Sequence, residues 1–317
     1  MISKPNNKVP NVHFVIHSNE KTTPIVELSL KYFDKYIGLD NINISVIANR
    51  FTQPNLPYSD KVNYITPNIP FNDGGYHFGP VLKNFIDSIQ EEYFFYFCED
   101  YMLIDDINIE QLNRLITLMK GENVDLFSFA SNQPIVHNWK KHENNTQYGF
   151  EENEIFYTRK GFLYEYSVQP CLWRKSSFNV LLQYNPEVGL HHLDTSHIKG
   201  KKGTYRAIDF NGGDQIYVDW PEDEKYNFKV LCSRYMIMDY FPQAGERFCI
   251  KYIEIIRWGK ITMPGTPGPN LANDNWVQQK IFGIVDENNL KNRPEYDRYF
   301  YKKPWAFLYP WQQSQKD

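Results

Sequence analysis

Residues 93–103 read YFFYFCEDYML, a run of large apolar and aromatic side chains interrupted by two adjacent carboxylates, Glu99 and Asp100. The run before the carboxylates has the length and composition of a strand that is buried on both faces. A solvated turn at the end of such a strand would normally carry Gly, Pro, Asn or Ser, and this one carries none of them. The stretch therefore predicts a buried strand with two carboxylates at its end.

Strands and helices alternate around this stretch in the first half of the chain. Thr23 and Pro24 have the residue types of an N-cap followed by proline at the first helical position, and Gly38 is expected to end that helix. Asn108 is expected to cap a later helix, which Gly121 ends. The expected strands cover residues 11–17, 42–48, 61–66, 93–97 and 124–130, and the expected helices cover residues 23–37, 79–90 and 109–120.

This alternation predicts an α/β fold with a mainly parallel central sheet flanked by helices. In such sheets, ligands bind beyond the carboxyl ends of the strands, where the strand order reverses. We therefore expect YFFYF to be a central strand, with Glu99 and Asp100 at its carboxyl edge facing a ligand cleft.

The second half of the chain is less regular. FLYEYSVQPCLW is interpreted as a strand followed by a turn, SSFNVLLQY as a helix, and residues 230–238 as a late strand, with long loops over residues 186–220. The composition changes near PGTPGPN, and the tail after it is aromatic and charged without clear periodicity. This pattern predicts a catalytic domain over residues 1–263 and a C-terminal aromatic extension, residues 264–317, packed on it.

Composition limits the classes of partner and compartment. The chain has 317 residues, 42% of them hydrophobic, with a net charge of −4. Its acidic balance predicts no nucleic-acid partner. The four cysteines have no metal-binding spacing. The N-terminus lacks the apolar core of a signal peptide. No apolar run approaches the ~20 residues that are needed to cross a bilayer. These features favour a cytoplasmic protein.

Two carboxylates at a strand end suit a hard divalent cation. Mg²⁺ and Mn²⁺ prefer oxygen ligands and commonly join one or two carboxylates to substrate phosphates. The alternative is that Glu99 or Asp100 caps the following segment or pairs with a buried arginine.

Two motifs together resemble the GT-A fold glycosyltransferases, which use nucleotide sugars. FYFCEDYML resembles the acidic signature of these enzymes in its relaxed Glu-Asp form, and YSVQPCLWRKSSFNVLL is similar to a Ser-Leu-Gln-Pro-x-hydrophobic-Trp segment of a bacterial and viral group. The resemblance covers about residues 10–260. It implies a GT-A-like sheet with an irregular acceptor-side second half, a nucleotide-diphosphate sugar donor, and Mn²⁺ or Mg²⁺.

The resemblance also implies roles for residues at the strand ends. Asp100 matches the last Asp of the signature and is expected on the metal or the diphosphate, with Glu99 as its neighbour; the first Asp of a strict Asp-x-Asp falls on Cys98. Four residues that follow the first two strands are expected at the nucleotide, with an ordinary loop as the alternative: Asn19, Glu20, Asn49 and Arg50.

The acceptor side is expected in the loop EVGLHHLD, residues 187–194. Inverting enzymes of this fold use a base that takes the proton of the acceptor hydroxyl. Asp194, His192 and Glu187 remain open as that base, and His191 is a candidate metal ligand beside Asp100. Further candidates for the cleft are Asp214, Gln169 and Trp173, with a turn or the core as alternatives.

The sequence therefore predicts a glycosyltransferase with a glycan hydroxyl as acceptor. Inversion is favoured over retention because a base can be named. A nucleotidyltransferase and a non-catalytic carbohydrate-binding protein are the alternatives, although HSNEKTTP lacks the glycines of a phosphate loop. Lys302, Lys303, Trp305 and Trp311 in the tail suggest peripheral membrane contact, and packing on the domain is the alternative favoured for them.

Overall fold

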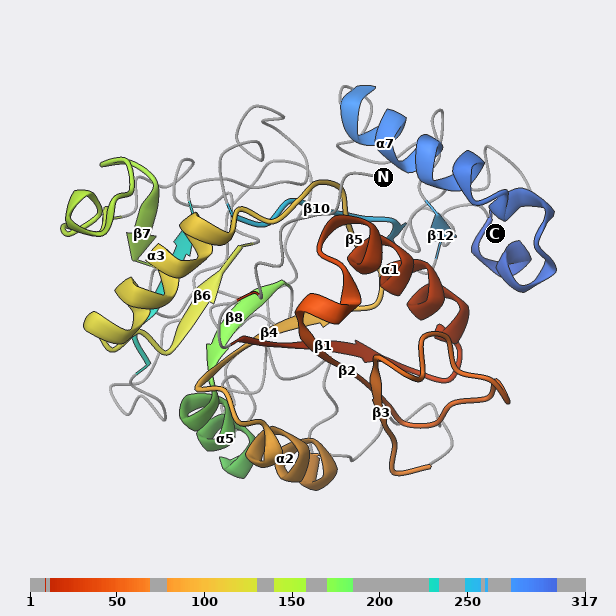
Figure 1. The fold of residues 1–317 in the computed structure, drawn as a ribbon, viewed down its shortest axis with the longest axis horizontal. Helices are drawn as coiled ribbons and strands as arrows, with labels where there is room; N and C mark the ends of the chain where they lie inside the picture. The colour runs from red at the N-terminus through yellow and green to blue at the C-terminus, as the bar shows by residue number, and fades with distance from the viewer. Residues whose placement is uncertain are drawn as a thin grey trace, which may run out of the picture.

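The computed structural model of the chain describes residue 9 and residues 12–68, 79–129, 140–157, 170–184, 228–233, 249–257, 260–261 and 275–300. Within these residues the largest sheet has eight strands in the order β3-β2-β1-β4-β8-β6-β9-β7 (Figure 1). The strands are β1 Val12–Ser18, β2 Asn43–Ala48, β3 Asn63–Ile65, β4 Tyr93–Cys98, β6 Leu126–Ser128, β7 Ile155–Tyr157, β8 Cys171–Arg174 and β9 Val230–Ser233. Smaller pairs join β5 Tyr101–Leu103 to β10 Tyr252–Glu254, and β11 Ile256–Arg257 to β12 Lys260–Ile261.

The sheet is mainly parallel, as the alternation predicts. Strands β1, β2, β3 and β4 form one parallel block, and β6 pairs in parallel with β9. Strand β8 lies between β4 and β6 and is antiparallel to both, and β7 is antiparallel to β9. The segment CLW, interpreted from sequence as a turn, is therefore a strand inside the sheet.

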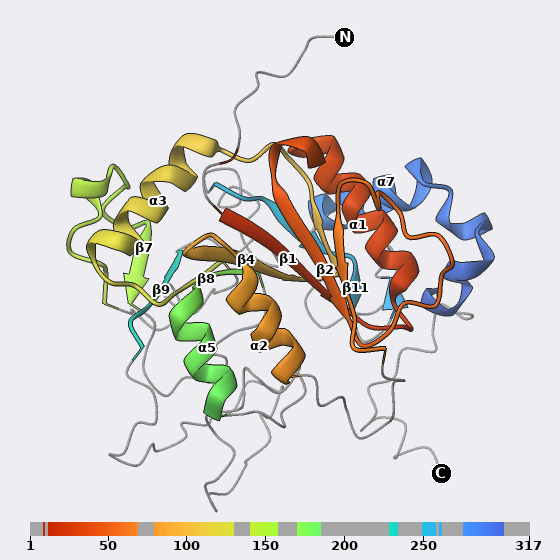
Figure 2. The same cartoon turned by 60° about the horizontal axis from the view of Figure 1, so that its bottom comes forward.

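Helices cover both faces of the sheet, which explains the unbroken apolar character of β4. Tyr93, Phe95 and Phe97 belong to the core under α1 (Thr23–Tyr36) and α3 (Ile109–Gly121). Phe94 and Tyr96 point the other way, toward α2 (Gly79–Ser88) and α5 (Lys175–Tyr184). Figure 2 shows these two layers, with α2 and α5 side by side on one face. A strand with helices on both faces has no solvated side for polar residues.

The predicted helix boundaries are close to the observed ones. Helix α1 begins at Thr23, with Thr22 as its N-cap, one residue before the predicted cap. Asn108 caps α3 as predicted, because its Oδ1 accepts a hydrogen bond of 3.0 Å from the Gln111 amide. Gly121 is the last residue of α3, and Glu122 occupies the C-cap.

Residues 275–300 form an element that the sequence analysis did not predict. Helix α7 (Asn275–Glu287) is followed by two 3₁₀ turns, η4 (Leu290–Asn292) and η5 (Pro294–Tyr299). Figure 1 shows α7 beside α1, and the carboxylate of Glu287 lies 3.1 Å from Lys35 Nζ on that helix. Buried residues of this segment belong to the same core as α1: Ile281, Ile284, Val285, Leu290, Tyr296 and Tyr299. The segment packs on α1, and the predicted domain boundary at residue 263 stays a prediction.

Candidate active site at the carboxyl edge of the sheet

Neighbouring strands β2, β1 and β4 end together at one edge of the sheet. In the register of the parallel block, His17 of β1 lies beside Ile47 of β2 and Cys98 of β4. The chain leaves β1 toward β2 and β3 on one side, and returns to β4 on the other side. Strand order therefore reverses between β1 and β4, which is the position where open α/β sheets bind ligands.

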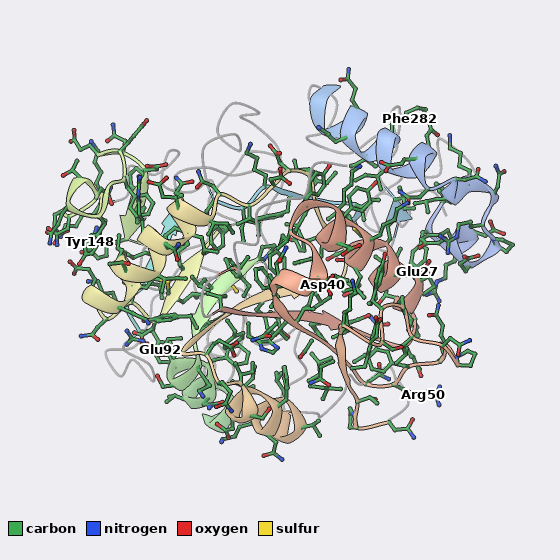
Figure 3. The ribbon with its side chains drawn as sticks, viewed as in Figure 1. Glu27, Asp40, Arg50, Glu92, Tyr148 and Phe282 are labelled. Carbon is green, nitrogen blue, oxygen red and sulfur yellow. The ribbon has the colours of Figure 1, made fainter. Side chains whose placement is uncertain are left out.

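The predicted nucleotide residues after β1 and β2 lie together at this edge. Arg50 Nη2 is 2.6 Å from Glu20 Oε2, and its Nε donates a hydrogen bond of 2.7 Å to the same oxygen. Asn49 is fully buried, and its Oδ1 accepts a hydrogen bond of 3.0 Å from the Glu20 amide. The ends of the two strands are thus joined by an ion pair and a hydrogen bond, and Arg50 stays partly exposed at the rim (Figure 3).

Asn19 organises the turn between β1 and α1, residues 19–22. Its Oδ1 accepts from the Lys21 amide at 2.9 Å, and its carbonyl accepts from the Thr22 amide at 3.0 Å. Thr22 Oγ1 in turn accepts from the Asn19 amide at 3.2 Å and lies 3.1 Å from Ser18 Oγ. An Asn side chain bonded to the backbone two residues ahead is a common turn-former, so Asn19 shapes the turn itself.

Glu99 is a buried carboxyl group at the end of β4. Its amide donates to the carbonyl of His17 at 3.0 Å, which continues the pairing of β4 with β1, and its residue is 9% exposed. Burial raises the pKa of Glu99 to about 7, and a hydrogen bond with the Thr22 side chain partly opposes this shift. The side chain therefore lies against the β1–α1 turn, and its contact is a threonine hydroxyl.

Asp100 forms the turn between β4 and β5 and is less buried than Glu99. Its carbonyl accepts a hydrogen bond of 2.8 Å from the Ile255 amide, which fixes the backbone of the turn. Within the described part of the chain, no group of three or more His, Cys, Asp and Glu side chains could hold a metal ion.

The C-terminal segment also reaches this edge, a contact that sequence reasoning missed. Tyr299 is 4% exposed, and its hydroxyl donates a hydrogen bond of 2.7 Å to the carbonyl of Lys21 in the β1–α1 turn. Burial raises the pKa of Tyr299 to about 12, and the charge of Glu99 makes a smaller contribution in the same direction. The aromatic run YDRYF was the only signal in the sequence for this contact, and it carries no periodicity.

Several predicted site residues lie outside the described residues. These are Gln169, Glu187, His191, His192, Asp194 and Asp214, together with the tail residues Lys302, Lys303, Trp305 and Trp311. Trp173 is described, and it belongs to the core: it is fully buried in β8, with its ring 5.2 Å from that of Phe178. Of the two interpretations of Trp173, the structure therefore supports packing.

No helix in the described ranges is long and apolar enough to cross a membrane.

Comparison with known proteins gave matches to solved structures only. No family model and no curated protein matches the chain. The crystal structure of S. aureus TarS 1-349 is 16% identical to the chain, with a TM-score of 0.36. The crystal structure of GalNAc-T7 with UDP, GalNAc and Mn²⁺ is 9% identical to it, with a TM-score of 0.43. The TarS match covers 58% of this chain and 53% of the TarS chain. The GalNAc-T7 match covers 90% of this chain and 52% of the GalNAc-T7 chain.

A third similar structure is the mannosyltransferase PcManGT from Pyrobaculum calidifontis in complex with GDP-Man and Mn²⁺. It is 12% identical, with a TM-score of 0.34, and the match covers 62% of this chain and 54% of that one. The chain thus spans about half the length of these three solved structures. At TM-scores below 0.5, these similarities support no conclusion about its activity.

Proposed function

We propose that the protein is a glycosyltransferase that moves a sugar from a nucleotide-diphosphate donor to a hydroxyl group of a glycan. The observation that carries the proposal is the set of polar groups at the reversal point of the sheet. Glu20, Asn49 and Arg50 are joined there by direct contacts, and Glu99 and Asp100 follow the neighbouring strand β4. The Glu99-Asp100 pair belongs to the sequence that resembles the acidic signature of the GT-A fold enzymes.

The proposed chemistry divides the site into a donor side and an acceptor side. Glu20 and Arg50 contact the nucleotide in this scheme, the buried Asn49 supports the Glu20 backbone, and Asn19 shapes the turn beside them. The acceptor oxygen forms a bond to the anomeric carbon while the bond from that carbon to the diphosphate oxygen breaks. The proton of the acceptor passes to a base, for which we propose Asp194 first and His192 or Glu187 next. Attack opposite to the leaving group makes the reaction inverting.

We propose a divalent cation at this edge. Asp100 would hold it, with Glu99 as its neighbour and His191 as a further proposed ligand, and the diphosphate would supply the remaining oxygens. When bound, Mn²⁺ or Mg²⁺ neutralises the negative charge that develops on the departing diphosphate. Cys98 stands where a strict Asp-x-Asp would place its first carboxylate, so this chain offers one acidic ligand fewer.

A panel of UDP-, GDP-, CMP- and dTDP-sugars tests the proposal directly. Binding is measured calorimetrically with Mn²⁺, with Mg²⁺ and with EDTA, and slow donor hydrolysis is followed as release of free nucleotide. We expect one nucleotide class to bind and to be hydrolysed in a cation-dependent way. Release of pyrophosphate from a nucleoside triphosphate and a sugar phosphate would instead show a nucleotidyltransferase. Glycan binding without any donor turnover would show a carbohydrate-binding protein.

A further inference from the structure

Turn η5 (Pro294–Tyr299) lies across the start of α1 and the β1–α1 turn, and we call it the C-terminal strap. Two buried tyrosines attach it. Tyr299 Oη donates to the Lys21 carbonyl at 2.7 Å, and Tyr296 Oη donates to the Pro24 carbonyl at 2.6 Å. Tyr296 is fully buried and Tyr299 is 4% exposed. Arg293, just before the strap, has its Nη2 3.5 Å from Glu27, the α1 carboxylate labelled in Figure 3.

The two tyrosines hold different parts of the structure. Pro24 lies in the first turn of α1, so the hydrogen bond from Tyr296 attaches the strap to a helix that is already fixed by its own packing. Lys21 lies in the turn of residues 19–22, which carries Glu20. The hydrogen bond from Tyr299 therefore acts on the turn that contributes the proposed nucleotide residue.

The β1–α1 turn is fixed on three sides. Asn49 of the β2 end accepts from the Glu20 amide, Asn19 accepts from the amides of Lys21 and Thr22, and Tyr299 donates to the Lys21 carbonyl. The third contact comes from a residue 278 positions away in sequence. The Tyr299 phenol is a donor at neutral pH, as an ordinary tyrosine is, and burial raises its pKa further, to about 12.

We propose that Tyr299 is a positioning residue for donor binding: the C-terminal strap holds the β1–α1 turn in the conformation that receives the nucleotide diphosphate. This inference rests on the proposed function. If the turn samples other conformations, the apparent affinity for the nucleotide falls in proportion to the population of the competent one. A strap that fixes the turn in advance removes this loss, so the C-terminal segment contributes to binding as well as to folding.

The test compares Tyr299→Phe with Tyr296→Phe. Each variant keeps the buried ring and loses the hydrogen bond that its hydroxyl donates to a backbone carbonyl. Tyr299→Phe also removes the acceptor of a hydrogen bond from Arg298, but that side chain is exposed and water replaces the contact, so the two variants should lower the melting temperature by similar amounts. Binding of UDP, GDP, CDP and dTDP is measured with Mn²⁺ for both variants and the wild type. We expect Tyr299→Phe to raise the dissociation constant about fivefold, which corresponds to one net hydrogen bond, and Tyr296→Phe to leave it within about twofold.

Hydrogen–deuterium exchange provides a second readout that needs no nucleotide. Tyr299→Phe should accelerate exchange of the amides of Glu20, Lys21 and Thr22, and Tyr296→Phe should not. Equal weakening of nucleotide binding by the two variants would overturn the inference, as would wild-type affinity and wild-type exchange in Tyr299→Phe. If the wild-type protein binds none of the four nucleotides, the proposed function fails, and the exchange experiment still decides whether Tyr299 holds the turn.

Discussion

Glu99 and Asp100 are consecutive residues, yet the turn after β4 gives them different surroundings. Glu99 is directed into the protein against Thr22, and burial raises the pKa of its carboxyl group to about 7. Asp100 begins the reversal into β5 and is more exposed. A carboxyl group that is partly protonated near neutral pH is a poorer cation ligand than an ionised one. In the proposed scheme, Asp100 therefore comes before Glu99 as the cation ligand.

Replacing Asp100 by Asn should lower kcat by about two orders of magnitude or more, because a neutral amide stabilises the cation and the leaving diphosphate poorly. Asp106→Asn is the matched control: the same chemical change is made at an exposed position shortly after β5. Steady-state kinetics with the donor identified by the panel, and circular dichroism for the fold, measure the outcome. Wild-type turnover in Asp100→Asn would remove Asp100 from the site.

Asp194→Asn should lower kcat by a factor of about 10² to 10⁴, which is the usual contribution of a general base. Donor binding should stay close to that of the wild type, because the donor is held by the first half of the chain in our proposal. His192→Ala and Glu187→Ala are measured in parallel, and the variant with the largest loss of kcat at unchanged donor affinity identifies the base. If Asp194→Asn weakens donor binding without changing turnover, the division into donor and acceptor sides is wrong.

His142 gives a pH dependence that is separate from the site. It is 1% exposed, and burial lowers its pKa; Glu122 and Glu143 oppose this shift, and Lys229 adds to it. The unfolded chain, with a histidine pKa of about 6.5, binds this proton more readily than the folded protein. The stability contributed by neutral His142 is therefore complete above that pH and is lost as the pH falls through the folded pKa.

Thermal unfolding of the wild type and of His142→Leu between pH 7.5 and pH 5 measures this effect. We expect the melting temperature of the wild type to fall more steeply on acidification than that of the variant, which has no proton to bind at this position. The difference between the two curves isolates His142 from the other titrating groups. If the melting temperatures of the two proteins fall in parallel with pH, His142 does not contribute to the pH dependence of stability.

At the scale of the elements, local signals define helix α3. Helix α3 begins where the Asn108 side chain accepts the Gln111 amide, and it carries buried leucines at the spacing of one helical face, among them Leu112, Leu115 and Leu118. A cap satisfies one of the backbone amides that a helix leaves unpaired at its start. These signals lie within a few residues of each other, so they could be predicted without knowledge of the fold.

Asn108→Ala should reduce the free energy of unfolding by about 1 kcal/mol, the usual cost of losing an N-cap. Asn113→Ala is the matched control, since Asn113 lies on the exposed face of the same helix, where alanine is the better helix former. Urea denaturation of both variants measures the change in the free energy of unfolding that each substitution causes. A loss of the same size in Asn113→Ala would mean that the cap is not the cause.

At the scale of the whole molecule, residues 275–300 are part of the main core. Ile281 and Ile284 of α7 belong to the same apolar cluster as the residues of α1 and β1. Lys35 and Tyr32 of α1 both contact Glu287 at the end of α7. The first helix and the end of the described chain therefore share one buried surface.

Ile281→Ala should lower the free energy of unfolding by about 2 to 5 kcal/mol, because it leaves a cavity in this shared core. Phe282→Ala, at the neighbouring position, should change it by less than about 0.5 kcal/mol, since Phe282 is 41% exposed. Differential scanning calorimetry should show a single transition that shifts as a whole in Ile281→Ala. A separate low-temperature transition, affected alone, would show that α7 unfolds independently of the sheet.

The sequence by itself determined the parallel block and its polar edge. YFFYF predicts a doubly buried strand, helical periodicity and caps predict α1 and α3, and the residues that follow each strand must meet at one edge because parallel strands share their carboxyl ends. Glu20, Asn49 and Arg50 could be predicted as neighbours for this reason, and the structure joins them by direct contacts.

Only the tertiary structure decided which distant segments complete the fold. Strand β8 enters the sheet between β4 and β6, Trp173 becomes core, and Tyr299 reaches Lys21 from the far end of the chain. Local propensity carries no information about such contacts, since they depend on which surfaces remain uncovered after the elements have packed. The burial of Glu99, and with it the pKa of its carboxyl group, has the same origin: it is set by packing against other segments and cannot be read from the Glu-Asp pair.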